Sequence, residues 1–181
     1  MKYLRRFIWY IATRLTILCL VFSIVIVLFY YAMNVFNMQV VVKDGMAKRA
    51  YYVMTGKDGT DLNKYFAHSF LDRDELVLSV KNGTSPYKEY KDYGIVGIDH
   101  RVSLSWMWCW PWENRSRVDF IEEIPKIDSR SKSYQTTTAK GAERSYPPSW
   151  QNAKSVKHRA ILVRENGKWL IQALQTLEIH P

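Results

Sequence analysis

Cysteine is scarce in this 181-residue chain, which contains only Cys19 and Cys109. Cys19 lies in an apolar run and Cys109 lies far along the chain, so the two cannot form the disulfide framework of a small secreted domain. Their spacing fits no cysteine-based metal site either. We therefore expect no metal and no cofactor. Exported domains that fold without disulfides are commoner in bacteria than in animal secretory pathways, which favours a bacterial envelope.

Charge is absent from residues 15–33, a run that also lacks proline and glycine. As a helix, this run would extend over roughly 28 Å, about the hydrocarbon thickness of a bilayer. Tyr10 and Tyr30 frame it about 30 Å apart, which is typical of two aromatic interfacial belts. Amphipathic periodicity is missing, which argues against a buried helix of a soluble protein. We predict one transmembrane helix over residues 15–33.

Acidic residues are absent from the first fourteen positions. The bases there are Lys2, Arg5, Arg6 and Arg14. After the apolar run the first charges are Lys43 and Asp44, which cancel, so the positive-inside rule predicts a cytoplasmic tail at 1–14 and export of the rest. A cleaved signal peptide is the competing interpretation. The apolar run is longer than a signal peptide needs and YYAMNVF offers no good cleavage site, so we expect the anchor to be retained.

The net charge of the chain is +9, and four of the positive charges lie in the tail, which leaves about +5 for the exported part. This surplus suits a surface close to anionic lipid headgroups. No cluster of lysine and arginine is dense enough to predict a nucleic-acid interface, so no nucleic-acid partner is expected. The predicted partners are membrane lipid and other envelope proteins, or further copies of this chain.

Residues 34–56 predict a juxtamembrane helix that carries the membrane helix outward. Its apolar residues recur at steps of three and four, at Val35, Met38, Val42, Met46, Ala50 and Val53. We favour the interpretation that this segment is the first core helix of the exported domain, and we place that domain at 43–181. The alternative is a stalk that self-associates. Thr60 or Asp61 can cap a second, short helix. Residues 75–80 fit either a strand or a helix.

The remainder of the chain predicts an antiparallel sheet. The expected strands are residues 93–110, 117–127, 156–164 and 168–179, with a polar loop at 129–154 that could include an edge strand at 134–138. Even positions of the first strand are apolar except for His100, and the register of the second strand is ambiguous. Asn166-Gly167 predicts a two-residue type I′ hairpin. The last strand is apolar on both faces, which predicts a central position in the sheet.

The chain has helices first and then long strands, and it ends in the hairpin RENGKWLIQALQTLEI. This order resembles the nuclear-transport-factor-2-like (NTF2-like) superfamily, in which a closing strand that begins with NGKW is frequent. Behind one membrane helix, the chain is also similar to exported domains of bacterial conjugation, secretion and sporulation-channel components. The resemblance implies an α+β fold with N-terminal helices packed on a curved antiparallel sheet in a cone. It also implies a structural or assembly role through protein–protein contacts.

Enzymes of that superfamily place Asp, His or Tyr inside the pocket of the cone. The candidates here are Asp99, His100 and Tyr93, while the remaining histidines are scattered. Neighbouring strand residues point to opposite faces, so Asp99 and His100 cannot both line one pocket, and this separates the pair that acid–base catalysis needs. We therefore predict no catalytic residues. A small-ligand-binding or enzymatic domain that uses the concave pocket is the alternative function.

The most unusual segment is WMWCWPW, in which Trp106, Trp108, Trp110 and Trp112 alternate with other residues. Three interpretations compete: filling of the mouth of the cone, a surface that docks on a membrane or a protein, and a platform that stacks ring-shaped ligands. We favour contact with a partner and predict these tryptophans as binding residues. Cys109, between two of them, is expected to be a small buried side chain.

Overall fold

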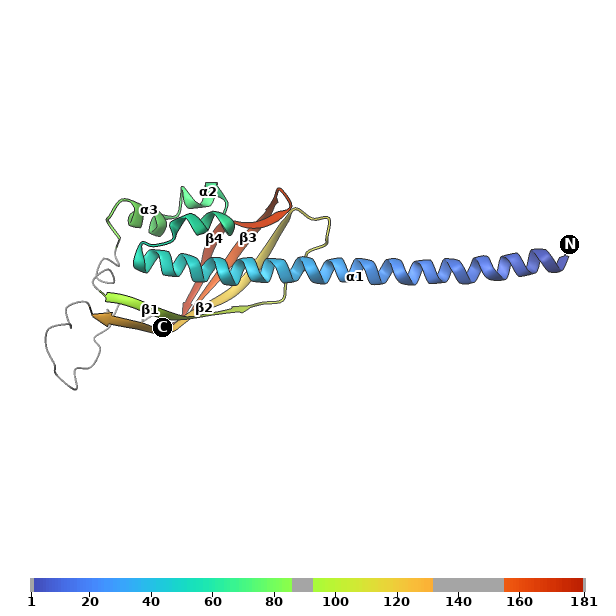
Figure 1. The fold of residues 1–181 in the computed structure, drawn as a ribbon, viewed down its shortest axis with the longest axis horizontal. Coiled ribbons are helices and arrows are strands. Elements are labelled where there is room, and N and C mark those ends of the chain that lie inside the picture. Colours follow the sequence, from blue (N-terminus) through green and yellow to red (C-terminus); the bar gives the residue numbers. More distant parts are fainter. Residues whose placement is uncertain (1, 86–92, 132–154, 181) are drawn as a thin grey trace.

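The computed structural model describes residues 2–85, 93–131 and 155–180, and it confirms the α+β class (Figure 1). The elements are α1 (Lys2–Thr55), the 3-10 helix η1 (Gly59–Lys64), α2 (His68–Leu71), α3 (Glu75–Lys81), β1 (Tyr93–Leu104), β2 (Arg115–Ser131), β3 (Ser155–Glu165) and β4 (Lys168–His180). The edge strand predicted at 134–138 lies outside the described residues.

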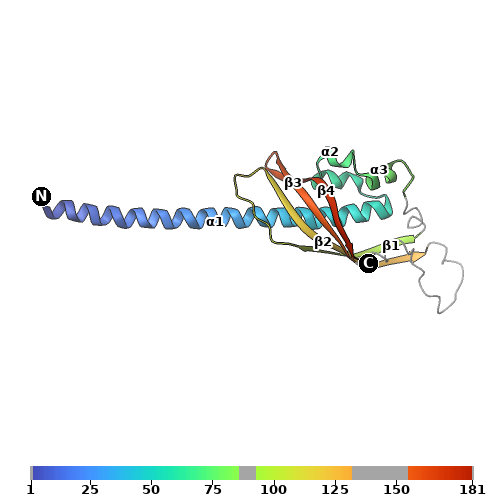
Figure 2. The same ribbon diagram turned by 180° about the vertical axis from the view of Figure 1, so that it is seen from behind.

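Helix α1 is a single helix of 54 residues, so the predicted membrane helix and the predicted juxtamembrane helix are continuous. The sequence of this helix contains no proline and one glycine, Gly45, so no residue within it is expected to break the helix. Figures 1 and 2 show the N-terminal half of α1 projecting away from the domain and its C-terminal half lying along the sheet. The helix contains one span that is long and apolar enough to cross a membrane.

The stripe predicted on the second half of α1 is its buried face. Met38, Val42 and Met46 are buried against side chains from the short helices and the sheet, among them Phe66 and Phe120. A second, smaller apolar cluster lies near the end of α1 and contains Ala50, Met54, Ile124 and Ile127. Apolar burial of this kind supplies most of the stability of an amphipathic helix, so the C-terminal half of α1 is part of the domain core.

The four strands form one antiparallel sheet in the order β1-β2-β3-β4. The prediction that the last strand is central is therefore wrong, since β4 is an edge strand. A register shift against β3 leaves Gln172 unpaired, so Ile171 before it and Leu174 after it both pack against the core, although simple alternation places them on opposite faces. The segment before α2 covers part of the edge: the backbone N–H of Ala67 donates to the Ile171 carbonyl at 3.0 Å, and the Ile171 N–H donates to the Tyr65 carbonyl at 2.8 Å.

The same contact explains a second difference from prediction. The expected helix beginning at Thr60 or Asp61 is divided into η1 and α2, because the residues between them leave the helical path to bond with Ile171. The segment at 75–80 is the helix α3, and the Asp74 side chain caps it by accepting from the Leu76 N–H at 3.1 Å. The Asn166-Gly167 hairpin is confirmed, with φ of 50° and 79° at its two turn residues.

Strand β1 departs from simple alternation at two register irregularities against β2, one between Ile95 and Gly97 and one between Asp99 and Arg101. An extra residue in a strand shifts the faces that follow it. Ile95 and Ile98, which alternation places on opposite faces, therefore both pack against the smaller apolar cluster.

Candidate functional site

The connection between β1 and β2, residues 105–114, carries the four neighbouring tryptophans, and we name it the tryptophan loop. We predicted that the first strand continues to residue 110, and this is wrong because β1 ends at Leu104. The alternation survives nonetheless, since Met107 and Cys109 point into the core. The exposed fractions of the tryptophans that point outward are 84% for Trp106, 57% for Trp108 and 66% for Trp112. Three of the four indoles therefore do not fill the core.

Two side chains of α1 hold the tryptophan loop in place. The Tyr31 hydroxyl donates to the carbonyl of Met107 at 3.3 Å, and the Asn34 Nδ2 group donates to the carbonyl of Trp110 at 3.4 Å. The carbonyls of Met107 and Trp110 are thus bonded to the helix and not to another strand.

Asn34 also joins the tryptophan loop to the last hairpin. Its Oδ1 atom accepts from Trp169 Nε1 at 2.7 Å and from Arg164 Nη2 at 3.0 Å. Arg164 Nη1 in turn donates to the carbonyl of Pro111 at 2.9 Å, and the guanidinium carbon lies 5.2 Å from the centre of the Trp169 ring. Helix, loop and hairpin therefore form one hydrogen-bonded unit at the point where the domain begins.

The rings of the tryptophan loop form a cluster that starts on α1. Tyr31 lies 5.1 Å from Trp108 between ring centroids, and Trp108 meets Trp110 edge-on at 5.2 Å. Trp110 and Trp112 are stacked at 5.0 Å with an angle of 7° between their planes. Aromatic pairs at these distances stabilise one another beyond their area burial, which keeps the exposed rings in a defined arrangement.

Cys109 is fully buried beneath the tryptophans, as predicted for a small core side chain. Burial raises the pKa of its thiol, and Asn34 Nδ2 lies 3.4 Å from the sulfur atom. A raised pKa keeps the group as a neutral thiol at physiological pH, so Cys109 is a poor nucleophile.

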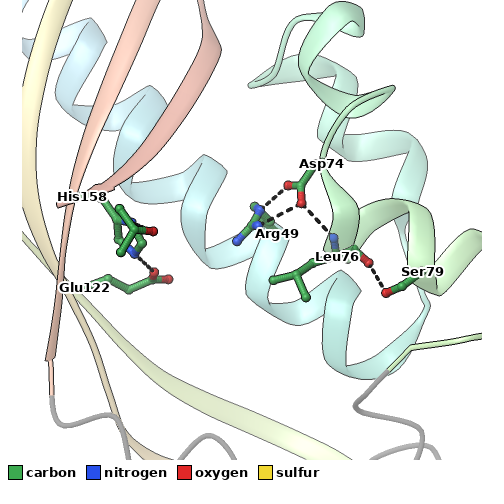
Figure 3. Close-up of polar contacts among 7 residues, drawn as sticks. Arg49, Asp74, Leu76, Ser79, Glu122 and His158 are labelled. Atoms are coloured by element: carbon green, nitrogen blue, oxygen red, sulfur yellow. Dashed lines mark hydrogen bonds and ion pairs between the residues drawn. The ribbon is translucent and has the colours of Figure 1, made fainter. Parts of the chain in front are cut away.

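A cavity of about 600 Å³ lies between the short helices and strands β2 to β4. Its polar and charged lining includes Arg49, Asp74, Glu122, His158, Gln172 and Thr176. Figure 3 shows Glu122 and His158 on the strand side and Arg49 with Asp74 on the helix side. Cavities of this size with a few convergent polar groups are the usual form of a small-molecule site.

Glu122 is the buried acid of the cavity. His100 Nε2 lies 2.7 Å from one carboxylate oxygen, and His158 Nε2 lies 3.1 Å from the other. Burial opposes ionisation of Glu122, but the hydrogen bonds from His100 and His158 outweigh it and lower the pKa of the carboxyl to about 2. The carboxylate is therefore ionised at neutral pH and weakly basic, whereas an efficient general base has a pKa near the working pH.

Arg49 and Asp74 form the second charged pair of the cavity. Arg49 Nε lies 2.6 Å from one oxygen of Asp74 and Nη2 lies 3.0 Å from the other, with both side chains mostly buried. Because Asp74 also caps α3, this pair ties that helix to α1. A bidentate pair with its remaining valences bonded is stable in a buried position.

The structure separates the three residues predicted for a pocket. The Asp99 side chain pairs with Arg101 on the exposed side of β1, while His100 turns inward to Glu122. Tyr93 lies at the first position of β1, opposite Ser131, and its side chain lies outside the description. Asp99 and His100 therefore do not meet, and His100 is the one of the pair that bonds beside the cavity.

Sequence reasoning missed Glu122 and His158. A signal for them exists, because Glu122 interrupts the buried apolar positions Val118, Phe120 and Ile124 of β2, just as His100 interrupts the apolar face of β1. Strands that pair side by side bring such interruptions together. The pairing of the second and third strands then adds His158.

The described residues contain no group of three or more His, Cys, Asp or Glu side chains placed to hold a metal ion. Within the cavity, Glu122 bonds to His158 and Arg49 bonds to Asp74. Comparisons with protein-family models, with curated proteins and with solved structures found no match.

Proposed function

We propose that this chain is a single-pass membrane protein of the bacterial envelope, with a cytoplasmic N-terminus and an exported domain. The domain acts as a structural or assembly component of an envelope complex through protein–protein contacts. The basic tail at 1–14 supports this orientation. Helices followed by an antiparallel sheet with the NGKW hairpin support an NTF2-like cone as the finer fold.

The observation that carries the proposal is the continuity of α1. The apolar run ends at Met33 and the first buried residue after it is Asn34, followed one turn later by Met38. No flexible linker separates the membrane span from the core, so the domain is a rigid extension of its anchor. A component of a membrane complex needs its contacts at a defined height above the bilayer, and a rigid link to the anchor supplies that height.

The free edge of β4 is the surface we propose for a protein partner. Beyond Ile171, the only described strand that pairs with β4 is β3, and Leu177 and Ile179 are exposed there. Unpaired strand edges with apolar side chains accept a strand from another chain. The partner strand would add its main-chain hydrogen bonds to this edge.

Cross-linking in native membranes tests this edge. In a Cys19→Ser background, Ile179→Cys places a thiol on the edge, and Ser103→Cys is the matched control on the exposed surface of β1, the opposite edge strand. Cys109 is buried and remains unmodified in the folded chain. We expect a short thiol-reactive cross-linker to give a discrete adduct from position 179 and none from position 103. Equal adducts, or none at 179, would contradict the proposed contact.

Membrane-impermeant maleimide tests the orientation separately. With right-side-out vesicles, a thiol placed at the exposed turn residue Lys57 should be labelled before the vesicles are opened. Labelling only after opening would place the domain in the cytoplasm and overturn the export part of the proposal.

Binding of a small ligand in the cavity is the second candidate function, and the cavity with its buried Glu122 and His158 favours it. Ala173 lines the same cavity, so Ala173→Phe would fill part of it. If the cavity binds a ligand, the purified parent should retain a small molecule in native mass spectrometry and this variant should lose it. The edge-strand cross-link would be unchanged.

A further inference from the structure

We propose that the tryptophan loop is a second membrane contact, with the indoles of Trp106, Trp108 and Trp112 lying in the headgroup region of the leaflet on the domain side. This inference rests on the proposed membrane anchor, because it places the loop relative to α1. It adds a site of lipid contact to a domain whose proposed role otherwise concerns protein partners.

The height of the loop follows from its hydrogen bonds. The residues of α1 that hold it are Tyr31 and Asn34, and the apolar run ends between them at Met33. At 1.5 Å per residue these two anchors lie roughly 5 Å apart along the helix axis. The interfacial region of a leaflet is about 5–7 Å thick, so a loop bonded at this height lies within it when the apolar run occupies the hydrocarbon.

The position of the loop in the domain agrees with this height. Figures 1 and 2 show the β1–β2 connection and the β3–β4 turn at the end of the domain that faces the projecting part of α1. The hydrogen bond from the Arg164 N–H to the Asn114 carbonyl, 2.9 Å long, joins these two connections. The domain therefore presents one end to the bilayer, and the exposed indoles are on that end.

The chemistry of the exposed side chains fits a lipid interface. Tryptophan prefers this region because its ring is apolar and its N–H still reaches water or headgroups. The indoles continue the aromatic side chains of α1, since Tyr31 packs on Trp108 at 5.1 Å. A protein-docking surface at the same place would have to compete with headgroups for these rings.

Charge contributes little to the contact. The charged side chains nearest the loop and the turn are the bases Arg115, Arg164 and Lys168 and the acids Glu113 and Glu165, which leaves a net charge of only +1 there. We therefore expect the contact to form on zwitterionic vesicles and to persist in high salt, in contrast to a contact that depends on anionic lipid.

Depth-dependent quenching in proteoliposomes tests the inference on the full-length chain. Three versions carry an environment-sensitive fluorophore on their one accessible thiol, with Cys109 buried in each. The label is at native Cys19 in the first, at Trp106→Cys in the second and at Lys57→Cys in the third, the last two in a Cys19→Ser background. The vesicles are phosphatidylcholine with bromine either near the headgroup or deep in the chains. Trp112→Cys is a second loop position in case Trp106→Cys disturbs folding.

We expect the label at 106 to be quenched most by shallow bromine, the label at 19 most by deep bromine, and the label at 57 by neither. If the label at 19 is quenched and the labels at 106 and 112 are not, the loop contact is wrong and the proposed anchor is still supported. Loss of quenching at 19 would overturn the anchor itself. The labels at 106 and 112 could instead be unquenched in the vesicles but shielded from solvent in native membranes. This result would assign the loop to a protein partner and would also overturn the inference.

Discussion

The indole N–H of Trp169 donates a 2.7 Å hydrogen bond to Asn34, although the two residues are 135 positions apart in the chain. Asn34 is the first buried residue after the apolar run, and Trp169 is the second residue of β4. One amide side chain thereby fixes the end of the domain nearest the predicted membrane span to the last strand.

Removal of this amide should destabilise the domain. Asn34→Ala leaves the N–H groups of Trp169 and Arg164 without their acceptor in a buried position, so we expect a loss of about 2–4 kcal/mol in the free energy of unfolding. Urea denaturation in detergent, followed by the fluorescence of the domain, measures it. Asn34→Asp keeps the acceptor and, like Asn34→Ala, loses the N–H that bonds to the Trp110 carbonyl, so the difference between the two variants reports the acceptor bonds, and the loss should be smaller for Asn34→Asp. Equal losses would show that the two acceptor bonds contribute little.

The second prediction concerns acid stability. The pKa of Glu122 is lowered from its ordinary value of 4.5 to about 2, because hydrogen bonds from His100 and His158 outweigh the opposing effect of burial. A carboxyl group whose pKa is lower in the folded state stabilises the fold above its unfolded value. This stability should be present above about pH 4.5 and be lost as the pH falls toward 2.

Urea midpoints measured between pH 2 and 7 test this prediction with two variants. Glu122→Gln should be less stable than the parent at pH 7 and should lose less stability on acidification. Asp119→Asn is the comparison. In the parent, a hydrogen bond from Arg159 also lowers the pKa of the Asp119 carboxyl, but this side chain is more exposed than Glu122. The change in the pH dependence of stability should therefore be smaller for Asp119→Asn. A parent curve that is flat between pH 2 and 4.5 is the contrary result.

Local signals in the sequence were sufficient for the apolar N-terminal helix, the helical stripe and the last hairpin. Each depends on neighbours within a few residues: an uncharged run, a step of three and four, and the pair Asn166-Gly167. The structure has a helix with an apolar span, a buried stripe and a turn with positive φ at these places.

The errors arose where contacts between distant residues decide the outcome. Alternating tryptophans continue a strand pattern, but the carbonyls of that segment bond to Tyr31 and Asn34, more than seventy positions earlier in the chain. Two apolar faces on the last strand indicate a centre strand, but its outer edge is covered in part by the residues around Phe66. Nothing within either segment encodes these partners.

The candidate site was predictable in part. The exposed tryptophans could be identified from their own spacing, whereas the acid of the cavity required the pairing of three strands to be known. His100 was noticed as an interruption of the apolar face, and its partner Glu122 would have followed from pairing the first strand with the second. The cavity itself depends on how α2 and α3 lie over the sheet, which no local pattern gives.

The third prediction concerns the buried ion pair at the cavity. Arg49→Met leaves the carboxylate of Asp74 without its bidentate partner, and loss of one member of a buried pair costs about 3–5 kcal/mol. Asp74→Asn retains an oxygen that can cap α3, whereas Asp74→Ala loses both the pair and the cap. We expect Asp74→Ala to be the less stable of the two by about 1 kcal/mol, measured by urea denaturation. Equal stability would mean that the cap contributes nothing.

The last prediction concerns a close approach of α1 to the rest of the domain, at Gly45. A Cβ atom added there would lie 3.0 Å from the Cβ of Tyr65 and 3.3 Å from Ile171 Cδ1, so the packing leaves little room for a side chain at this position. Gly45→Val should lower the free energy of unfolding by about 1–3 kcal/mol through overpacking, although valine has the better helix propensity. Gly97 is the matched control, since nothing lies within 4 Å of an added Cβ and valine suits a strand, so Gly97→Val should keep or raise the thermal midpoint. If Gly45→Val has the same thermal midpoint as the parent, α1 does not pack this closely on the last strand. The rigid link that we propose between the membrane helix and the domain would then lose its support.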